Sequence, residues 1–589
     1  MALSILRHLA PGLHRNFRCS TKLLLSSGQS LNHERPFTSS RKALAEDAAS
    51  SESLPQSERT VGAGQSLFQE LSSLGSVENA LEAISQREMS GNEASIAVRA
   101  LRHIQKNDSA SPGFVTDKRF SSLATSIIGG VKNLSNESLT STLANAFHVN
   151  SNNDDFILAL EGECRRRLRL FPIRSIATIV CNDQLLSKRT ETKALVNEAA
   201  RVLELRWREL QNPQLVRRLL PSAARVSEPL LERVEDKTLE MLSQFSFQEI
   251  TALMKSLVAT NTRSLPILRA ISYQLLEQRS QWEIPAMMDI MSAMGNLGFH
   301  NAALFSEFAV HIQQKLDECS LSLLCDIAKT YAVLRIQASN LLDSIHTVLA
   351  GALDELTILD LKRLLFAYSQ FSYQPLGAST FYVEVGNKLD ANFDDYSAKD
   401  QIDVAHSLTV LKQVPQKIVT KILKNIEESQ EAPLSATLKL KLLQINAYSQ
   451  LDFPDYEGPY LTSDLKSFPA NHKIYTTTLH RSLFKVLQAS LGDDLTMVEN
   501  VKSDLGYIID AEISSKLKGN GKKLAIMTFG PPSYLYSTSQ LVGRLEMMLS
   551  HLELTGYQVL QIPYQDWYPL RTPVQQVNYL KDKLIGILE

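Results

Sequence analysis

The sequence is poor in the residues that mark metal-binding, disulfide-linked and membrane-spanning proteins. It has five cysteines in 589 residues, at positions 19, 164, 181, 319 and 325, and none of them forms a CxxC pair. No apolar run reaches the roughly 18 to 20 residues that a membrane-spanning helix needs. We therefore expect reduced thiols, no metal site, no cofactor and no insertion into a membrane.

Phosphate-transfer motifs are absent as well. The sequence contains no GxGxxG, HRD or DFG element, which a protein kinase uses to hold and transfer phosphate. The Gly519-Asn520-Gly521 turn before Lys522 fits a loop between two strands better than a phosphate cradle. Kinase activity therefore has no support in the residues.

Acidic residues are missing from the beginning of the chain. The first acid is Glu34, whereas Arg7, Arg15, Arg18 and Lys22 precede it among many Leu and Ser residues. An amphipathic, basic and acid-poor leader is typical of a mitochondrial presequence. An exposed basic tail with no targeting function has the same composition. We expect a presequence over residues 1–37, a mitochondrial matrix location, and a disordered linker over 38–66, which is rich in Ser, Ala, Glu and Gln.

A repeated segment is the strongest pattern in the chain. It reads LMKSLVAT, IMSAMGNL, IAKTYAVL, LLFAYSQF and VAHSLTVL, and its central large residues are Leu257, Met294, Tyr331, Tyr368 and Leu408. These residues are separated by 37, 37, 37 and 40 positions, with weaker copies around Phe147, Val180 and Leu220. A fixed period of this size indicates stacked helix pairs, in which the central residues belong to the core. The predicted fold class is therefore mainly α, an α-helical repeat solenoid over 67–319 that continues to about 490, and we expect residues 431–500 to continue as helices.

The C-terminal region changes pattern. Leu524 to Phe529 is a short apolar run stopped by Gly530-Pro531-Pro532, and Tyr557 to Ile562 is a second run stopped by Pro563. Between them the apolar residues have helical spacing, and Gly556 stands where a helix C-terminal cap is expected. A last helix follows from Val577 to Leu588. We expect a small α/β domain over 500–589, with its core at 524–584 and parallel strands.

Several unusual residues of this domain occur in a known order. They are Ala525-Ile526-x-x-x-Gly530-Pro531, Ser533-Tyr534, Leu545, Gly556-Tyr557-x-Val559, Ile562-Pro563-Tyr564-x-x-Trp567 and Tyr579-Leu580-x-x-Lys583-Leu584. The pattern resembles the RAP domain, the C-terminal module of the FAST-kinase-domain family of mitochondrial RNA-binding proteins. The resemblance implies a FAST domain 1-like helical region at 320–395 and a FAST domain 2-like helical region at 396–490.

The RAP domain is similar to a degenerate nuclease fold of the PD-(D/E)xK class, and this implies a test for catalysis. Such nucleases hold Mg²⁺ with carboxylates on two neighbouring strands. Asp510 and Glu512 are the candidates here, but the next strand has Met527 and Phe529 where acids are wanted, and no Lys follows in register. We therefore expect no enzyme activity, with a metal-dependent RNA endonuclease using Asp510 and Glu512 as an alternative.

Positive charge is concentrated in one stretch. Residues 165–225 contain fourteen Lys or Arg and five acids, although the whole chain has a net charge of −2. Such a surface suits phosphate contacts and stacking on unpaired bases, but it also fits a solvated face paired with neighbouring acids. The candidate RNA-binding residues are Arg165, Arg166, Arg167, Arg169, Arg174, Arg206, Arg208, Arg217 and Arg218.

Together these features predict a mitochondrial RNA-binding protein that regulates the stability, processing or translation of transcripts. The expected partners are mitochondrial mRNA and precursor transcripts, with RNA-processing or ribosome-assembly proteins as further candidates. A protein scaffold for ribosome or RNA-granule assembly is the second alternative, because helical repeats bind proteins as well as RNA.

Overall fold

The computed structural model describes residues 61–107, 114–149, 153–428, 434–453, 455–462, 467–469, 472–474, 476–490, 495–515 and 523–588. The predicted presequence and the Gly519-Asn520-Gly521 turn lie outside the described residues. Two compact units divide the described chain, 61–300 and 301–588. None of its helices is both long enough and apolar enough to cross a membrane.

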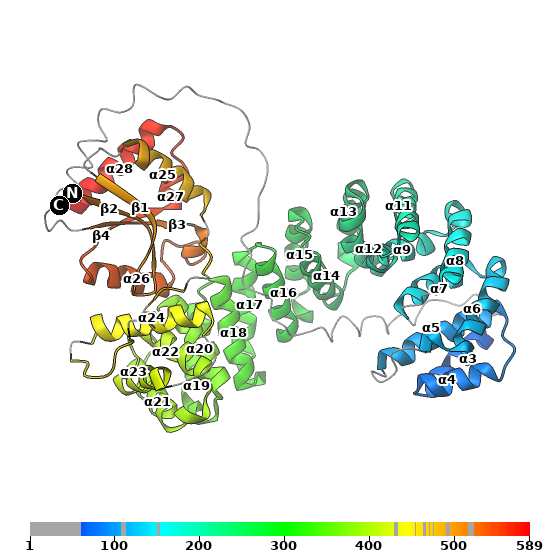
Figure 1. Ribbon diagram of the computed structural model, residues 1–589, viewed down its shortest axis with the longest axis horizontal. Coiled ribbons are helices and arrows are strands. Elements are labelled where there is room, and N and C mark those ends of the chain that lie inside the picture. Colours follow the sequence, from blue (N-terminus) through cyan, green and yellow to red (C-terminus); the bar gives the residue numbers. More distant parts are fainter. Residues whose placement is uncertain are drawn as a thin grey trace. The chain divides into compact units, whose positions relative to one another are not determined.

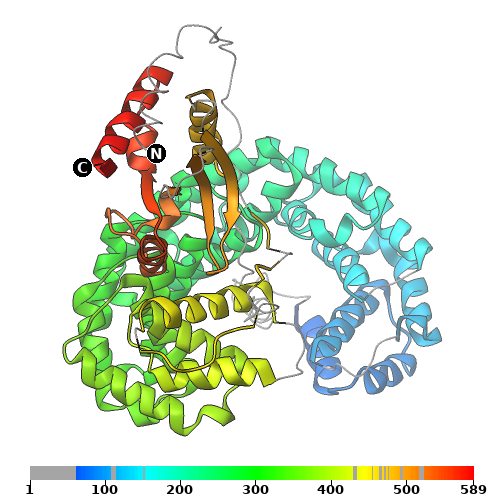
Figure 2. The same cartoon turned by 60° about the vertical axis from the view of Figure 1, so that its left-hand side comes forward.

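The unit 61–300 consists of two layers of stacked helices (Figures 1 and 2). Within each layer a helix packs against the helix of the next repeat. The first layer contains α3 (Val61–Ser73), α5 (Gly91–Asn107), α7 (Asn136–His148), α9 (Ile173–Cys181), α12 (Pro213–Val226), α14 (Phe247–Ala259) and α16 (Ile284–Asn296). The second layer contains α4 (Val77–Ser85), α6 (Lys118–Gly130), α8 (Asp154–Arg167), α11 (Thr190–Leu205), α13 (Glu228–Met241) and α15 (Leu265–Glu277), and the short α10 (Asp183–Leu186) follows α9. Helix α3 begins inside the predicted linker 38–66, because it packs against α5 and buries Leu71.

A short 3₁₀ turn joins each second-layer helix from α6 onward to the next first-layer helix. In this unit these turns are η3 (Val131–Asn133), η4 (Leu168–Leu170), η5 (Trp207–Glu209), η6 (Leu242–Gln244) and η7 (Arg279–Gln281), whereas η2 (Phe114–Thr116) lies between α5 and α6. From η3 onward a buried apolar residue follows the turn and anchors it in the core: Leu134, Phe171, Leu210, Phe245 and Trp282. A capping residue then begins the first-layer helix, such as Ser246, whose hydroxyl accepts from the backbone of Glu249. The repeat is therefore a helix, a turn, an anchor and a second helix.

The predicted repeat is confirmed by the positions of its central residues. Phe147, Val180 and Leu220 lie on α7, α9 and α12, and each of the five later central residues lies on a first-layer helix. All eight are buried, and Leu257 and Met294 are 0% exposed. The period of 37 residues therefore reflects the burial of one large central residue in each repeat.

The carbonyls of the five later central residues, from Leu257 to Leu408, also take part in ending their helices. The residue five positions later donates its N–H to the carbonyl, at 2.9 Å for Leu257 and 3.0 Å for Tyr331. This bond requires a left-handed backbone at the residue four positions after the central residue. At these positions φ is between 48° and 62°. The left-handed residues are Asn261, Gly298, Arg335, Ser372 and Lys412.

The unit 301–588 begins with the same two layers. Its first layer contains α18 (Leu321–Leu334), α20 (Ile358–Phe371), α22 (Ala398–Val410) and α24 (Ala436–Leu451). Its second layer contains α17 (Ala302–Gln314), α19 (Ser339–Gly351), α21 (Ala378–Ala391) and α23 (Gln416–Glu428), with turns η8 (Leu316–Glu318), η9 (Leu353–Glu355) and η10 (Phe393–Asp395). Ion pairs connect successive first-layer helices, among them Lys362 with Asp403 at 2.6 Å and Lys441 with Asp403 at 2.7 Å. These charges neutralise one another and hold the repeats together.

A four-stranded sheet with helices on both faces completes this unit (Figure 1). Its elements are α25 (Thr478–Ser490), β1 (Leu495–Lys502), β2 (Ile508–Ser515), β3 (Leu524–Phe529), η11 (Pro531–Ser533), α26 (Gly543–Leu554), β4 (Gln558–Pro563), α27 (Tyr564–Trp567) and α28 (Pro573–Leu588). Strand order is β1-β2-β3-β4, with β3 and β4 parallel and the other pairs antiparallel. Helices α25 and α28 contribute to one apolar core against the sheet, and α26 contributes to another.

The predicted α/β domain is confirmed, with one difference. The parallel strands, the intervening helix and the left-handed Gly556, at φ 89°, occur as expected. The helical pattern expected to continue to residue 500 is wrong, however, since 495–502 forms strand β1. Asp510 and Glu512 both lie within β2, because pairing with β1 extends that strand to Ser515.

Helix α26 attaches the sheet to the C-terminal ends of the first-layer helices. The N–H of Tyr536 donates to the carbonyl of Arg335 at 2.7 Å, and Ser372 hydrogen-bonds to Glu546. Gly543 approaches so closely that an added Cβ would lie 2.1 Å from the carbonyl oxygen of Ser369. A cavity of ≈ 300 Å³ remains between α20, α22 and α26.

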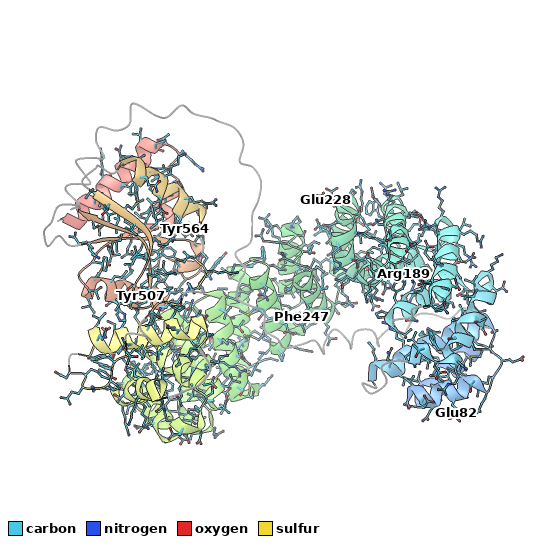
Figure 3. All side chains as sticks on the ribbon, viewed as in Figure 1. Glu82, Arg189, Glu228, Phe247, Tyr507 and Tyr564 are labelled. Atoms are coloured by element: carbon cyan, nitrogen blue, oxygen red, sulfur yellow. The ribbon has the colours of Figure 1, made fainter. Side chains whose placement is uncertain are left out.

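A buried histidine forms a second link across the same contact. His551 is 0% exposed and its ring hydrogen-bonds to the hydroxyl of Tyr507 at 2.8 Å and to Asp452 at 2.9 Å. Burial lowers the pKa of His551. Figure 3 shows Tyr507 where the sheet meets α24. The C-terminal domain and the helices before it therefore share a polar core.

Candidate nucleic-acid interface

The arginine-rich stretch 165–225 lies in the unit 61–300. It runs from the end of α8 through η4, α9, α10, α11 and η5 to α12 (cyan to green in Figure 1). Its cations fall into three groups: those that donate to backbone carbonyls of another repeat, those that pair with acids, and those that are exposed without an acidic partner.

Two of the predicted RNA-binding residues connect neighbouring repeats. Arg167 donates to the carbonyls of Leu134 at 2.8 Å and Lys132 at 2.7 Å. Arg206 occupies the equivalent place one repeat later and donates to the carbonyl of Phe171 at 2.8 Å. Each guanidinium therefore joins the end of one second-layer helix to the turn of the preceding repeat.

Two others balance buried acids. Arg166 pairs with Glu163 at 2.6 Å, and Arg165 pairs with Glu161 at 2.6 Å. The Glu163 side chain is only 6% exposed. Hydrogen bonds from Arg166 and Arg167 lower the pKa of the Glu163 carboxyl to about 2, although burial opposes this. These arginines are needed to hold Glu163 ionised inside the repeat.

The remaining predicted residues are more accessible. Arg169 and Arg218 are exposed and have no ion-pair partner among the residues that the structure describes. Arg208 is exposed, and its guanidinium carbon lies 5.8 Å from the centre of the Trp207 ring. Arg174 is 57% exposed and only 4.0 Å from Glu137, and Arg217 is half-buried on α12. A phosphate could approach Arg169, Arg208 and Arg218 without breaking an existing pair.

Sequence reasoning missed two cations. Arg233, beyond the stretch, also lies 5.8 Å from the Trp207 ring, and nothing in the linear sequence indicates this contact. Lys132 precedes the stretch and is exposed in η3. The repeat period provides a signal for Lys132, because Arg169 stands 37 residues later.

In the C-terminal domain, Asp510 is held by groups around it. One carboxylate oxygen accepts from the N–H of Thr528 at 2.6 Å and from its hydroxyl at 2.7 Å. The other lies 3.1 Å from His480 Nε2 on α25. This network fixes β2 to β3 and to α25.

Glu512 has different partners. It accepts from the hydroxyl of Tyr557 at 2.7 Å and lies 3.0 Å from the ammonium of Lys523. Burial raises the pKa of Tyr557, and so does its hydrogen bond to this carboxylate. The two carboxylates therefore have separate partners, Thr528 and His480 for Asp510 and Tyr557 and Lys523 for Glu512.

The positions that would carry acids in an active nuclease are apolar. Met527 is 4% exposed and Phe529 is 2% exposed, and both belong to the core that α26 contributes to. In the described part of the chain no three His, Cys, Asp or Glu side chains are grouped so that they could hold a metal ion. This strand therefore contributes packing where a nuclease would need ligands.

The fold defines the chain as a helical-repeat protein with a small C-terminal α/β domain. Comparison with known families is more specific. Residues 361–425 match FAST kinase-like protein subdomain 1, residues 439–521 match subdomain 2, and residues 526–583 match the RAP domain. The predicted boundaries 320–395 and 396–490 for the two FAST domains stay predictions.

Similar proteins are found along most of the chain. FAST kinase domain-containing protein 4 of Rattus norvegicus is 26% identical over 457 residues, 72% of each chain. The Homo sapiens protein of that name is 23% identical and covers 84% of each chain. Human FAST kinase domain-containing protein 3, mitochondrial, is 22% identical over 89% of this chain and 84% of its own. The chain therefore carries FAST kinase-like subdomains 1 and 2 and a RAP domain, and it is similar to FAST kinase domain-containing proteins over most of its length.

Proposed function

We propose that this chain is an RNA-binding protein of the mitochondrial matrix that regulates the stability, processing or translation of mitochondrial transcripts. The RAP and FAST kinase-like matches support this, and one of the similar human proteins carries the word mitochondrial in its name. The observation that carries the proposal is the set of exposed arginines on stacked repeats, Arg169, Arg208 and Arg218.

The physical basis is local charge on a nearly neutral protein. Guanidinium groups bind phosphate in a bidentate manner and stack on unpaired bases. The chain as a whole has a net charge of −2, so that attraction to RNA is confined to the surface that carries these residues. A repeat array then offers several such contacts along one strand.

The test is crosslinking to RNA in intact mitochondria, followed by sequencing of the bound fragments. A variant with Arg169, Arg174, Arg208 and Arg218 changed to Gln is compared with the wild type. Arg165, Arg166 and Arg167 are left intact, since their loss would leave buried acids unpaired. Defined transcript sites that weaken in the variant support the proposal. Recovery no better than a matrix control protein contradicts it and favours a protein scaffold.

The C-terminal domain has a binding role in this proposal, either to an RNA end or to an RNA-processing or ribosome-assembly protein. The positions of Asp510 and Glu512 support binding over hydrolysis, because each carboxylate is engaged by other groups. Purified wild type and Asp510→Ala should show the same background cleavage of RNA in Mg²⁺. Cleavage by the wild type that is lost in Asp510→Ala would establish the endonuclease alternative.

A further inference from the structure

The 3₁₀ turns of the unit 61–300 carry a row of accessible cations at one repeat position. Lys132, Arg169 and Arg208 each stand two residues before a buried anchor, which is Leu134, Phe171 and Leu210 in turn. We call these three cations the turn ridge. All three are exposed, and no ion pair engages them among the described residues. The ridge therefore presents one positive charge per repeat on three successive repeats.

Structural arginines hold these turns in register. Arg167, directly before η4, donates to the carbonyl of Lys132 in η3 at 2.7 Å. Arg206, directly before η5, donates to the carbonyl that follows η4 at 2.8 Å. Each turn is thereby fixed to the next, and neighbouring helices of such an array lie about 8 to 10 Å apart. The cations of the ridge are thus held at a regular spacing on a rigid support.

An apolar side chain accompanies each cation of the ridge. Leu170 follows Arg169 and is 83% exposed. Trp207 precedes Arg208 and is half-buried, and half-buried Val131 precedes Lys132. A cation beside an apolar surface suits a nucleotide whose phosphate meets the charge and whose unpaired base lies on the apolar group. In a duplex the faces of the bases are stacked inside the helix and cannot make this contact.

The same position changes charge in later repeats. It is Ser243 and Ser280 in the next two repeats of this unit, and Asp317, Asp354 and Asp394 in the unit 301–588. The three aspartates are exposed and repel phosphate. Contacts of this kind are therefore confined to the turns η3, η4 and η5.

From these observations we infer that the turn ridge is a binding track for single-stranded RNA, with one backbone contact per repeat at Lys132, Arg169 and Arg208. This inference rests on the proposed function and deepens it, since it assigns the contact to the edge formed by the turns. It also separates the arginines that hold the repeats together from those that meet the ligand.

The experiment measures binding of a labelled single-stranded RNA of about 20 nucleotides to the purified full chain by fluorescence anisotropy at several salt concentrations. The ridge variant combines Lys132→Gln, Arg169→Gln and Arg208→Gln. The matched control combines Lys188→Gln, Lys193→Gln and Arg201→Gln, which removes the same charge from exposed positions of the same unit. The same RNA in a duplex is the competing probe.

The ridge variant should bind at least tenfold more weakly and its salt slope should fall by about 2, because each phosphate contact to a single strand contributes about 0.7. The control should stay within about threefold of the wild type, and the duplex should bind more weakly than the single strand. Equal losses in both variants, or a larger loss in the control, would overturn the ridge while leaving RNA binding intact. Failure of the wild type to bind any RNA would instead overturn the proposed function.

Discussion

Arg167 and Arg169 stand two positions apart and have different tasks. Arg167 is 15% exposed in its side chain and donates to three carbonyls of the preceding repeat. Arg169 is exposed on the following turn and has no acidic partner in the described chain. Composition alone cannot separate them, because the difference depends on which carbonyls the fold places beside each guanidinium.

Stability should reveal this difference. Arg167→Gln should lower the free energy of unfolding by about 1 to 3 kcal/mol, because it removes the donor to the carbonyls of Leu134 and Lys132 and leaves the buried Glu163 with one partner fewer. Arg169→Gln should change it by no more than about 0.5 kcal/mol. Urea denaturation of both variants beside the wild type measures the two values. Equal stability of the two would contradict the assignment of Arg167 to the scaffold.

The ionisation of Glu163 makes a prediction about pH. Its pKa is lowered to about 2 in the folded state, so its contribution is present above the unfolded value of roughly 4.3 and is lost as pH falls through about 2. The protection factors of the α8 amides, corrected for the intrinsic exchange rate at each pH, should therefore fall between pH 4.5 and 2 more in the wild type than in Glu163→Gln. The same loss of protection in both proteins would show that another group controls acid sensitivity there.

The three left-handed residues Arg335, Ser372 and Lys412 matter at the scale of elements. A non-glycine residue in this conformation costs about 1 kcal/mol or more, and such positions persist where the surroundings fix them. Two of them contact the C-terminal domain, through the carbonyl of Arg335 and the hydroxyl of Ser372, and Lys412 pairs with Asp452. The C-terminal ends of the first-layer helices thus form the surface against which helix α26 and the loop before it pack.

Gly543 is the most sensitive point of this contact. Gly543→Ala should lower stability by about 1 to 3 kcal/mol, because the added methyl group collides with the carbonyl of Ser369. Gly162→Ala, within helix α8 and with open space around its Cβ position, should raise stability by about 0.5 to 1 kcal/mol. Thermal unfolding compares them. A neutral Gly543→Ala would mean that α26 does not need this close approach.

The sheet spans two of the matched segments, which leads to a prediction about fragments. Strands β1 and β2 lie within the subdomain 2 match, whereas β4 and all but the first two residues of β3 lie within the RAP match. Residues 523–589 alone lack β2 and α25, so that Leu524 and Ile526 lose their partners. This fragment should show no dispersed NMR spectrum, and 476–589 should be the more ordered of the two. A folded 523–589 would contradict the shared core.

Some strands of this domain can be predicted from the sequence and others cannot. Strands β3 and β4 are predicted because their apolar runs are buried and end at Pro or Gly-Pro. Strand β1 is missed because it is an edge strand with much of its surface exposed, Val498 being 54% exposed. The partners that engage Asp510 and Glu512 come from other elements, and no spacing in the sequence specifies them.

At the scale of the molecule, one repeat plan provides two kinds of surface. Turns of the unit 61–300 present Lys132, Arg169 and Arg208, whereas equivalent turns of the unit 301–588 present aspartates. The period of the repeat is readable in the sequence, since it reflects burial of one large residue in each copy. The charge of the turns is readable only after the anchors are known, because they define which positions are equivalent.

The most direct test of this account is to map RNA–protein crosslinks on the full chain by mass spectrometry after irradiation of mitochondria. The account predicts crosslinked peptides from the turns η3, η4 and η5, around residues 131–133, 168–170 and 207–209. Crosslinks found only within 301–588, or none above a matrix control protein, would contradict the claim that this chain binds RNA through its arginine-rich repeats.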